Sequence, residues 1–247
     1  YALLTGNSGG MDEGLLQAVR YGGIAHVFAV SGLHIGILFS AVMIVCKRLG
    51  KYRFVPACAL SLCYCAVCAF TVSSVQAVIM SSALGLYRAI GRKHDFLNSI
   101  SFAALLVLTF LPAQFLSAGF RLSFGACLGL ALYSVPLSRA FRKLPKFLGN
   151  YLSANLSVQL FTFPVLFETF GYFSVWGTLL NFVLIPLMPV LFLGVLSCGL
   201  LALIVSPAAA FLLSFPGGML SLLLFVFSAA DFSFVLTGFS LGAGGTV

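Results

Sequence analysis

The sequence His26-Val27-Phe28-Ala29-Val30-Ser31-Gly32-Leu33-His34-Ile35-Gly36 opens an apolar run that reaches Cys46. A run of about 20 apolar residues is long enough to cross a bilayer as a helix, so we predict a membrane-spanning helix over residues 26–46. Two histidines, a serine and two glycines lie within this stretch. Hydrocarbon solvates such polar groups poorly, and we therefore expect them to face protein, water or a substrate.

The composition of the whole chain agrees with a membrane protein. Of its 247 residues, 61% are hydrophobic and 7% are charged, whereas a soluble domain has about 45–50% apolar and about 25% charged residues. So few charges cannot cover a water-exposed surface. We predict an all-α fold, a polytopic transmembrane helical bundle of about eight spans. The predicted spans are 26–46, 54–71, 75–91, 96–111, 114–136, 150–168, 175–204 and 208–230.

The chain divides into three predicted parts, namely an amphipathic lead-in segment (1–25), the transmembrane domain (26–230) and a glycine-rich tail (231–247). The lead-in combines several apolar residues with Arg20, which is typical of a helix that lies at the membrane interface or re-enters the membrane. The chain starts at Tyr1 and looks excised from a longer protein. No signal peptide is visible at its N-terminus.

The basic residues predict the orientation in the membrane. Eleven of the 13 lysines and arginines fall in three alternate connections, near residues 47–53, 88–93 and 139–146. The connections between them carry no lysine or arginine. By the positive-inside rule the basic connections are cytoplasmic, and both ends of the domain then face outward. This orientation signal explains most of the net charge of +8, which is therefore weak evidence for nucleic-acid binding.

Small and proline residues predict how helices pack and bend. The spacings Gly32-x3-Gly36 and Gly125-x3-Gly129 favour close approach of neighbouring membrane helices. The long span 175–204 carries Pro186 and Pro189, so we expect a kink or break there.

Polar side chains inside the predicted spans are the candidate functional residues. Ser31 and His34 share one helix face, with His26 about 80° away on the same helix. Each polar residue has an alternative role as an interhelical hydrogen bond. For Arg121 we weigh snorkelling to headgroups, an outer vestibule that attracts an anion, and an ion pair with Glu168. The candidates are His26, Ser31, His34, Gln76, Arg121, Ser123 and Asn181, with Glu168 as a structural or ion-pair candidate, and other polar groups at Asn98, Asn155 and Gln159.

Five of the seven cysteines lie between Cys46 and Cys68, and Cys65-Ala66-Val67-Cys68 has CxxC spacing. Because no histidine or second CxxC completes a ligand set, we interpret these cysteines as small hydrophobic residues and expect no metal site or cofactor.

The stretch Gly22–Gly36 resembles the signature of the ComEC competence membrane domain family. Three further blocks agree, and together they cover residues 1 to about 200 in the order of the family. They are Pro112 followed by Ser117–Phe124, Pro164 with Phe170-Gly171, and Leu180-Asn181-Phe182 with Pro186-Leu187. Two positions depart from the family pattern, since Gln76 stands where the family commonly has arginine and Arg121 where it commonly has glutamine. We hypothesise that these two positions face one shared polar space.

The resemblance implies a channel in the bacterial cytoplasmic (inner) membrane that imports single-stranded DNA during natural transformation. It also implies outward-facing oligonucleotide-binding-type and metallo-β-lactamase-like domains, neither of which is in this sequence, so we expect no nuclease or other enzymatic activity. No P-loop occurs in the chain, and we predict a separate cytoplasmic ATP-driven motor. Two alternatives stay open, namely an intramembrane serine hydrolase that uses Ser31 and a secondary transporter of a small anion centred on Pro186.

Overall fold

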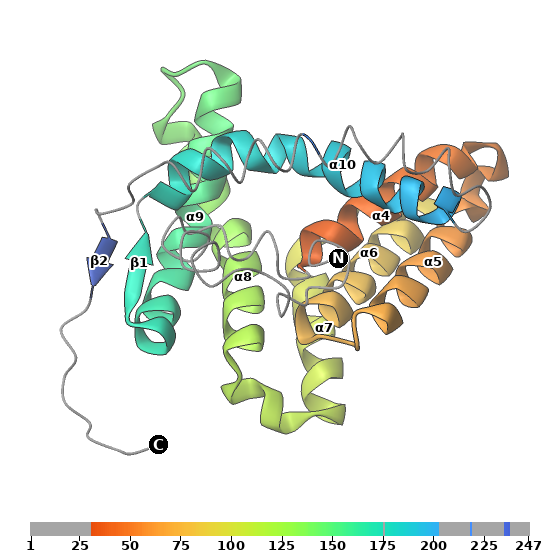
Figure 1. The fold of residues 1–247 in the computed structure, drawn as a ribbon, viewed down its shortest axis with the longest axis horizontal. Coiled ribbons are helices and arrows are strands. Elements are labelled where there is room, and N and C mark those ends of the chain that lie inside the picture. The colour runs from red at the N-terminus through yellow and green to blue at the C-terminus, as the bar shows by residue number, and fades with distance from the viewer. Residues whose placement is uncertain (1–30, 175, 203–217, 219–234, 238–247) are drawn as a thin grey trace.

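The computed structural model describes residues 31–174, 176–202, 218 and 235–237 of the chain, and it is predominantly helical (Figure 1). Each of the first seven predicted spans overlaps a helix of the described residues. The lead-in 1–25, the span 208–230 except residue 218, and all of the tail except 235–237 lie outside the described residues. The helices are α4 (Gly32–Val45), α5 (Phe54–Val67), α6 (Val72–Ala89), α7 (Phe96–Phe110), α8 (Ala118–Ala140), α9 (Lys146–Phe170) and α10 (Trp176–Ala202), with the 3-10 helices η1 (Cys46–Arg53) and η2 (Pro112–Leu116).

Three helical stretches of the described residues are long and apolar enough to cross a membrane. They are Gly32–Val67, which runs through η1, then Ala118–Ala140 and Leu179–Gly199. The apolar helix Phe96–Phe110 is shorter. Large apolar side chains such as Leu105 and Phe110 of α7 and Leu116 of η2 are exposed, as expected where lipid replaces water. The chain is therefore a membrane protein, and the count of about eight spans stays a prediction.

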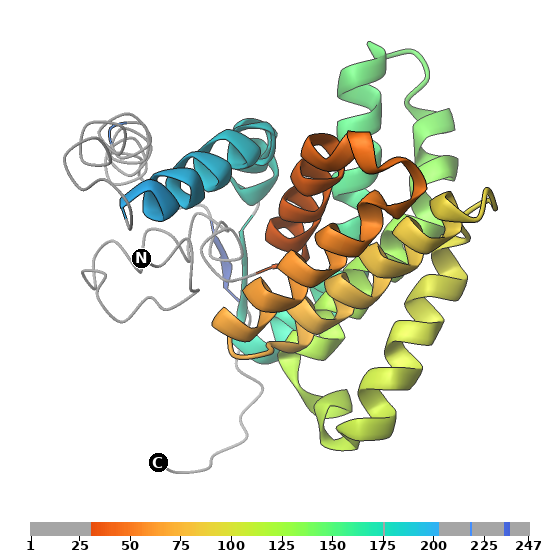
Figure 2. The same cartoon turned by 90° about the vertical axis from the view of Figure 1, so that its right-hand side faces the viewer.

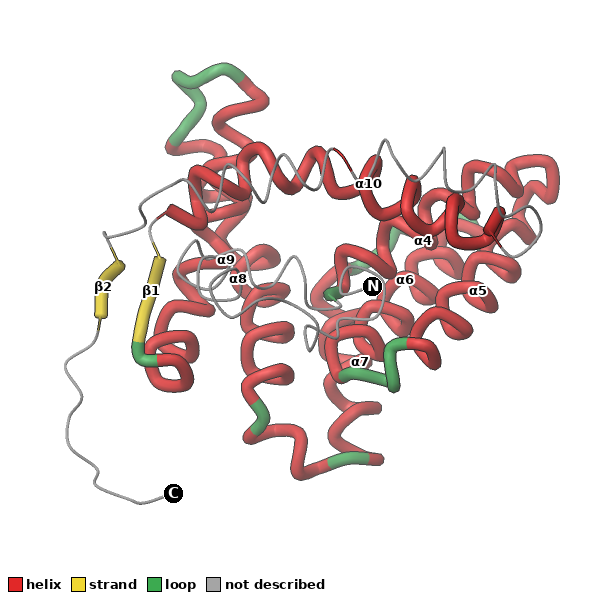
Figure 3. The backbone as a smooth tube through the Cα atoms, in the orientation of Figure 1, coloured by secondary structure: helices red, strands yellow, loops and turns green. Residues whose placement is uncertain are grey.

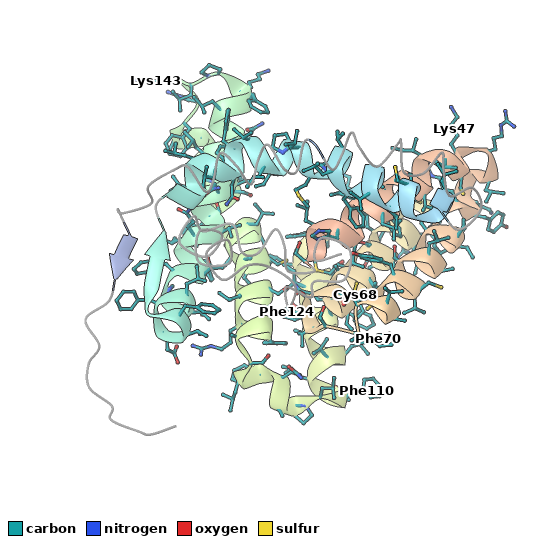
Figure 4. All side chains as sticks on the ribbon, viewed as in Figure 1. Lys47, Cys68, Phe70, Phe110, Phe124 and Lys143 are labelled. Atoms are coloured by element: carbon teal, nitrogen blue, oxygen red, sulfur yellow. The ribbon has the colours of Figure 1, made fainter. Side chains whose placement is uncertain are left out.

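Short connections join successive helices from α4 to α9 (Figure 3). The connection between α4 and α5 is η1, and α8 meets α9 through residues 141–145. Figure 4 shows Lys47 and Lys143, one from each of these basic connections, along the upper edge of the view, whereas Phe70 and Phe110 lie lower down. This placement agrees with the charge pattern of the sequence.

The core consists of separate apolar clusters rather than a single one. One cluster joins α4, α5 and α10 through residues that include Ile35, Tyr64 and Phe192. A second joins α7 and α8 through residues that include Ile100 and Phe124, with α6 packed against it. Figure 2 shows α10 on the α4 side of the α4–α7 group, whereas α7 lies on the side away from α10. The cysteines of the CxxC, Cys65 and Cys68, are buried in the first cluster, as expected for small hydrophobic residues.

Helices α8 and α9 pack directly against each other along a seam of small residues. A Cβ atom on Gly129 would collide with the carbonyl oxygen of Ser157, and a Cβ on Gly125 would lie 3.7 Å from the carbonyl oxygen of Phe161. Ser153 and Ser157 are buried on the facing side of α9, where their hydroxyls donate to carbonyl oxygens one turn earlier. The second glycine pair therefore has the predicted packing role. In the first pair, Gly32 touches Ala77 of α6, whereas a Cβ on Gly36 would meet open space.

Helix α10 runs from Trp176 to Ala202 through both Pro186 and Pro189 (Figure 1). The span is therefore not broken at these prolines, and the kink stays a prediction. Proline removes one N–H donor and crowds the preceding turn, but membrane helices tolerate this defect because neighbouring groups and small local adjustments compensate for the lost bond. The alternative of a transporter site at a broken helix loses its structural basis.

A short pair of strands was not predicted from the sequence. The strand β1 (Tyr172–Ser174), which follows α9, pairs antiparallel with β2 (Val235–Thr237) from the predicted tail. Phe173 is opposite Leu236 in this register. The pairing connects residues 235–237 to the segment between α9 and α10.

Candidate functional site

Ser31 and His34 form a local arrangement at the start of α4. Ser31 is the N-cap of the helix, with extended backbone angles, so it precedes α4 rather than sharing a helical face with His34. Its backbone N–H donates to His34 Nδ1 at 3.3 Å, and its hydroxyl lies 3.1 Å from the same nitrogen. Serine is a favoured N-cap because its polar atoms serve the unpaired first turn, which explains why α4 begins at Gly32. His26 lies outside the described residues.

His34 is a fully buried side chain, and the edge of its ring meets Phe192 of α10 with 5.0 Å between ring centroids. Because Nδ1 accepts the Ser31 N–H, the neutral imidazole carries its proton on Nε2. A serine hydrolase needs its base held on an element that presents a free nitrogen to the hydroxyl. Here the nitrogen nearest the hydroxyl already serves the helix cap, so the contact stabilises the α4 terminus.

Gln76 of α6 is 2% exposed and is bonded to α8. Its Oε1 accepts a hydrogen bond from the Ser123 hydroxyl, and its Nε2 donates to the sulfur atoms of Cys127 at 3.4 Å and Met80 at 3.7 Å. The sequence analysis named Gln76 and Ser123 as candidates but missed Cys127, which also bonds to Gln76. Buried amides are normally satisfied in this way. The Gln76–Ser123 contact is an interhelical tie inside an apolar interface.

Arg121 and Glu168 form an ion pair between α8 and α9. Arg121 donates from Nη1 to Glu168 Oε1 at 3.1 Å and from Nη2 to Oε2, a bidentate geometry. The two side chains are 34% and 63% exposed, so the pair lies at the surface of the bundle. Of the roles weighed for Arg121, the ion pair with Glu168 is the one that the structure shows.

Gln76 and Arg121 do not share one polar space, and that hypothesis is wrong. The α8 residues that contact Gln76 are Ser123 and Cys127. They follow Arg121 by two and six positions, which places them about 200° and 240° around the helix. The face of α8 that contacts Gln76 is therefore directed toward α6, whereas Arg121 is on the face directed toward α9. A side chain at one position cannot take over the charge of the other.

Two amide oxygens, one on α9 and one on α10, have no hydrogen-bond partner among the described residues. They are Oδ1 of Asn155 and Oδ1 of Asn181, and both are buried. The Asn155 amide nitrogen donates to the Tyr151 hydroxyl at 3.1 Å. The Tyr151 ring in turn meets Phe182, the neighbour of Asn181, with 4.9 Å between ring centroids. An unpaired carbonyl in an apolar setting is costly, so these oxygens mark a place suited to water or another donor.

The candidate residues fall into separate contacts in the described part of the chain. Two pockets of about 370 and 450 Å³ occur there, and neither is lined by a candidate residue. No group of three histidine, cysteine or acidic residues suited to a metal lies within the described ranges. Thus the structure pairs Ser31 with His34, Gln76 with Ser123, and Arg121 with Glu168, and it leaves Asn181 apart from them. Asn155 resembles Asn181 in its unpaired oxygen among the described residues, and its spacing of four from its partner Tyr151 was the available signal.

Comparison with known proteins supplies the family. The profile of the Competence protein family matches residues 3–243. The chain is 28% identical over 188 residues to ComE operon protein 3 of Bacillus subtilis (strain 168), an alignment that covers 75% of this chain and 24% of that relative. The match thus spans about a quarter of the length of the curated relative, and no solved structure matches the chain. The chain belongs to the Competence protein family, as its resemblance to the ComEC membrane domain indicated.

Proposed function

We propose that this chain is the membrane domain of a DNA-uptake system and conducts single-stranded DNA across the bacterial cytoplasmic membrane during natural transformation. Membership of the Competence protein family supports the role in uptake. The apolar helices support the location in a membrane. The proposed domain has about eight spans, with the basic connections in the cytoplasm and both ends outside. It performs no chemistry on the strand, so nuclease activity belongs to another domain or protein.

The observation that carries the proposal is that two buried amide oxygens, Asn155 Oδ1 and Asn181 Oδ1, find no hydrogen-bond donor among the residues that the structure describes. The contacts of Ser31 with His34, of Gln76 with Ser123 and of Arg121 with Glu168 explain helix packing without any passage. The Asn155 amide nitrogen donates to the Tyr151 hydroxyl, and Asn181 precedes Phe182, whose ring meets that of Tyr151. Polar groups beside aromatic faces suit a single strand, whose bases stack on rings and whose backbone retains water. We therefore propose that the DNA path follows the contact between α9 and α10 at Tyr151 and Phe182.

Import needs work from outside this chain. Moving one phosphate charge inward against an inside-negative potential costs about 2.3 kcal/mol per 100 mV. The chain contains no P-loop sequence. The proposed partner is a cytoplasmic ATP-driven motor that pulls the strand. The oligonucleotide-binding-type and metallo-β-lactamase-like domains implied by the family resemblance complete the proposed assembly on the outer side.

The test is uptake of labelled DNA in a transformable bacterium that depends on this chain. Asn155→Leu and Asn181→Leu should each reduce the number of transformants strongly, while leaving the amount of protein in the membrane unchanged. Asn150→Leu is the matched control, because Asn150 is an exposed amide on the same helix α9. Normal uptake in both the Asn155 and the Asn181 variant, with protein levels equal to the wild type, would show that the DNA path does not follow the contact between α9 and α10.

A further inference from the structure

A basic pocket opens between η1 and the end of α6, and none of the candidate site residues lines it. It has a volume of about 370 Å³, and its lining includes Lys51, Arg53 and Arg88. The remaining lining residues, Met43, Gly50, Gly85 and Ala89, carry no charge. Three cations from two different elements thus surround one cavity that contains no carboxylate.

The three cations have no counter-charge in the described part of the chain. The ion pair found there joins Arg121 to Glu168, well removed in sequence from this pocket. Lys51 Nζ lies over the Tyr52 ring at 5.2 Å from its centroid, which is a contact with a ring face rather than with an anion. Cations gathered around a cavity repel one another unless an anion joins them. The pocket therefore has the electrostatics of a binding site for a negatively charged group.

The surroundings of the pocket indicate which anion it binds. Leu49, Leu86 and Ile90 on the same two elements are each about half exposed, at 52%, 50% and 57%. Lys47 from η1 lies at the edge of the molecule that also carries Lys143 (Figure 4), at the level where the charge pattern places lipid headgroups. A ligand that is anionic at one end and apolar at the other satisfies both the cations and the exposed apolar side chains. An anionic phospholipid has this combination, whereas DNA and inorganic phosphate supply only the charge.

We propose that the pocket lined by Lys51, Arg53 and Arg88 binds the phosphate headgroup of an anionic phospholipid, whose acyl chains lie along the apolar side chains of η1 and α6. Basic pockets between membrane helices at the cytoplasmic surface are general features of headgroup recognition. Such a lipid fixes η1 against α6. This proposal depends on the membrane location of the chain and not on the passage of DNA.

Native mass spectrometry of the purified chain in detergent, titrated with phosphatidylglycerol or phosphatidylcholine, tests the proposal. The wild type should retain phosphatidylglycerol in preference to phosphatidylcholine. The variant Lys51→Gln/Arg53→Gln/Arg88→Gln should bind phosphatidylglycerol at least about ten-fold more weakly, since each cation near an anionic lipid contributes separately. The charge-matched control Arg139→Gln/Arg142→Gln/Lys143→Gln, in the α8–α9 connection, should bind it as the wild type does. Arg88→Gln alone, at an exposed position, should give an intermediate loss in a folded protein.

Three results would overturn the proposal. The first is equal retention of phosphatidylglycerol by the pocket variant and the wild type. The second is an equal loss in the charge-matched control, which would mean diffuse attraction without a site. The third comes from parallel titrations with inorganic phosphate and with a short single-stranded oligonucleotide. If either ligand depends on the three cations while phosphatidylglycerol binding does not, the pocket serves a free phosphate or the DNA backbone instead.

Discussion

Gly129 of α8 lies so close to the carbonyl oxygen of Ser157 in α9 that no side chain fits between them. Replacement by alanine forces the two helices apart, and we expect Gly129→Ala to destabilise the protein by about 1–3 kcal/mol. The matched control is Gly119→Ala in the same helix, where a Cβ atom meets nothing within 4 Å. Denaturation in detergent measures both. Equal stability of the two variants would mean that α8 and α9 do not pack through this seam.

The buried contact between Gln76 and Ser123 predicts a cost when one partner is removed. Ser123→Ala leaves Gln76 Oε1 buried without its donor, and we expect a loss of about 1–3 kcal/mol. The double variant Gln76→Met/Ser123→Ala should recover part of this loss, because it removes both polar groups. Ser138→Ala is the control, since that exposed hydroxyl of α8 donates only to its own helix at Val135. A double variant as unstable as the sum of the single variants would contradict an interhelical bond.

The ion pair between Arg121 and Glu168 predicts rescue by charge exchange. Arg121→Glu places two carboxylates together and should lower the thermal stability in detergent, and Arg121→Glu/Glu168→Arg should restore it. Arg139→Glu, at an exposed position near the other end of α8, should show no dependence on Glu168. The destabilisation should shrink at high salt, because the pair is at the surface. An Arg121 effect that does not change with the charge at position 168 would favour the anion vestibule instead.

The cap formed by Ser31 and His34 predicts no reactive serine. We expect a fluorophosphonate probe to give no labelling that disappears in Ser31→Ala, since His34 Nδ1 already accepts the Ser31 backbone N–H. Ser31→Ala should instead weaken the start of α4 by about 1 kcal/mol. Labelling of the wild type that Ser31→Ala abolishes would establish the hydrolase alternative.

The basic connections predict the side from which each end of a helix is reached. In a background whose seven cysteines are replaced by alanine, Lys47→Cys and Lys143→Cys should be protected from an impermeant maleimide in intact cells. Phe110→Cys, at the lower edge in Figure 4, should react. After the membrane is opened all three should react. Reaction of all three positions in intact cells would refute the orientation.

The helices were predictable from the sequence, because long apolar runs interrupted by basic connections determine them with little help from tertiary contacts. Gly125 and Gly129 also carried their packing role in their spacing. Partner choice was less accessible, because it depends on how helices rotate about their axes. Ser123 and Arg121 are two residues apart, yet they meet different helices. The continuity of α10 through its prolines and the β1–β2 pairing depend on contacts between distant segments, which local pattern does not encode.

The two prolines of α10 leave a chemical trace on the helix that contains them. In a regular helix, residues 186 and 189 would donate main-chain hydrogens to the carbonyl oxygens of Phe182 and Ile185, and proline has no such hydrogen to give. The carbonyl oxygens of Phe182 and Ile185, one and four residues after Asn181, therefore lack the N–H that a regular helix supplies. We expect an experimental map of the protein to show ordered water at these two oxygens, which would make this turn a hydrated stretch of an otherwise apolar helix.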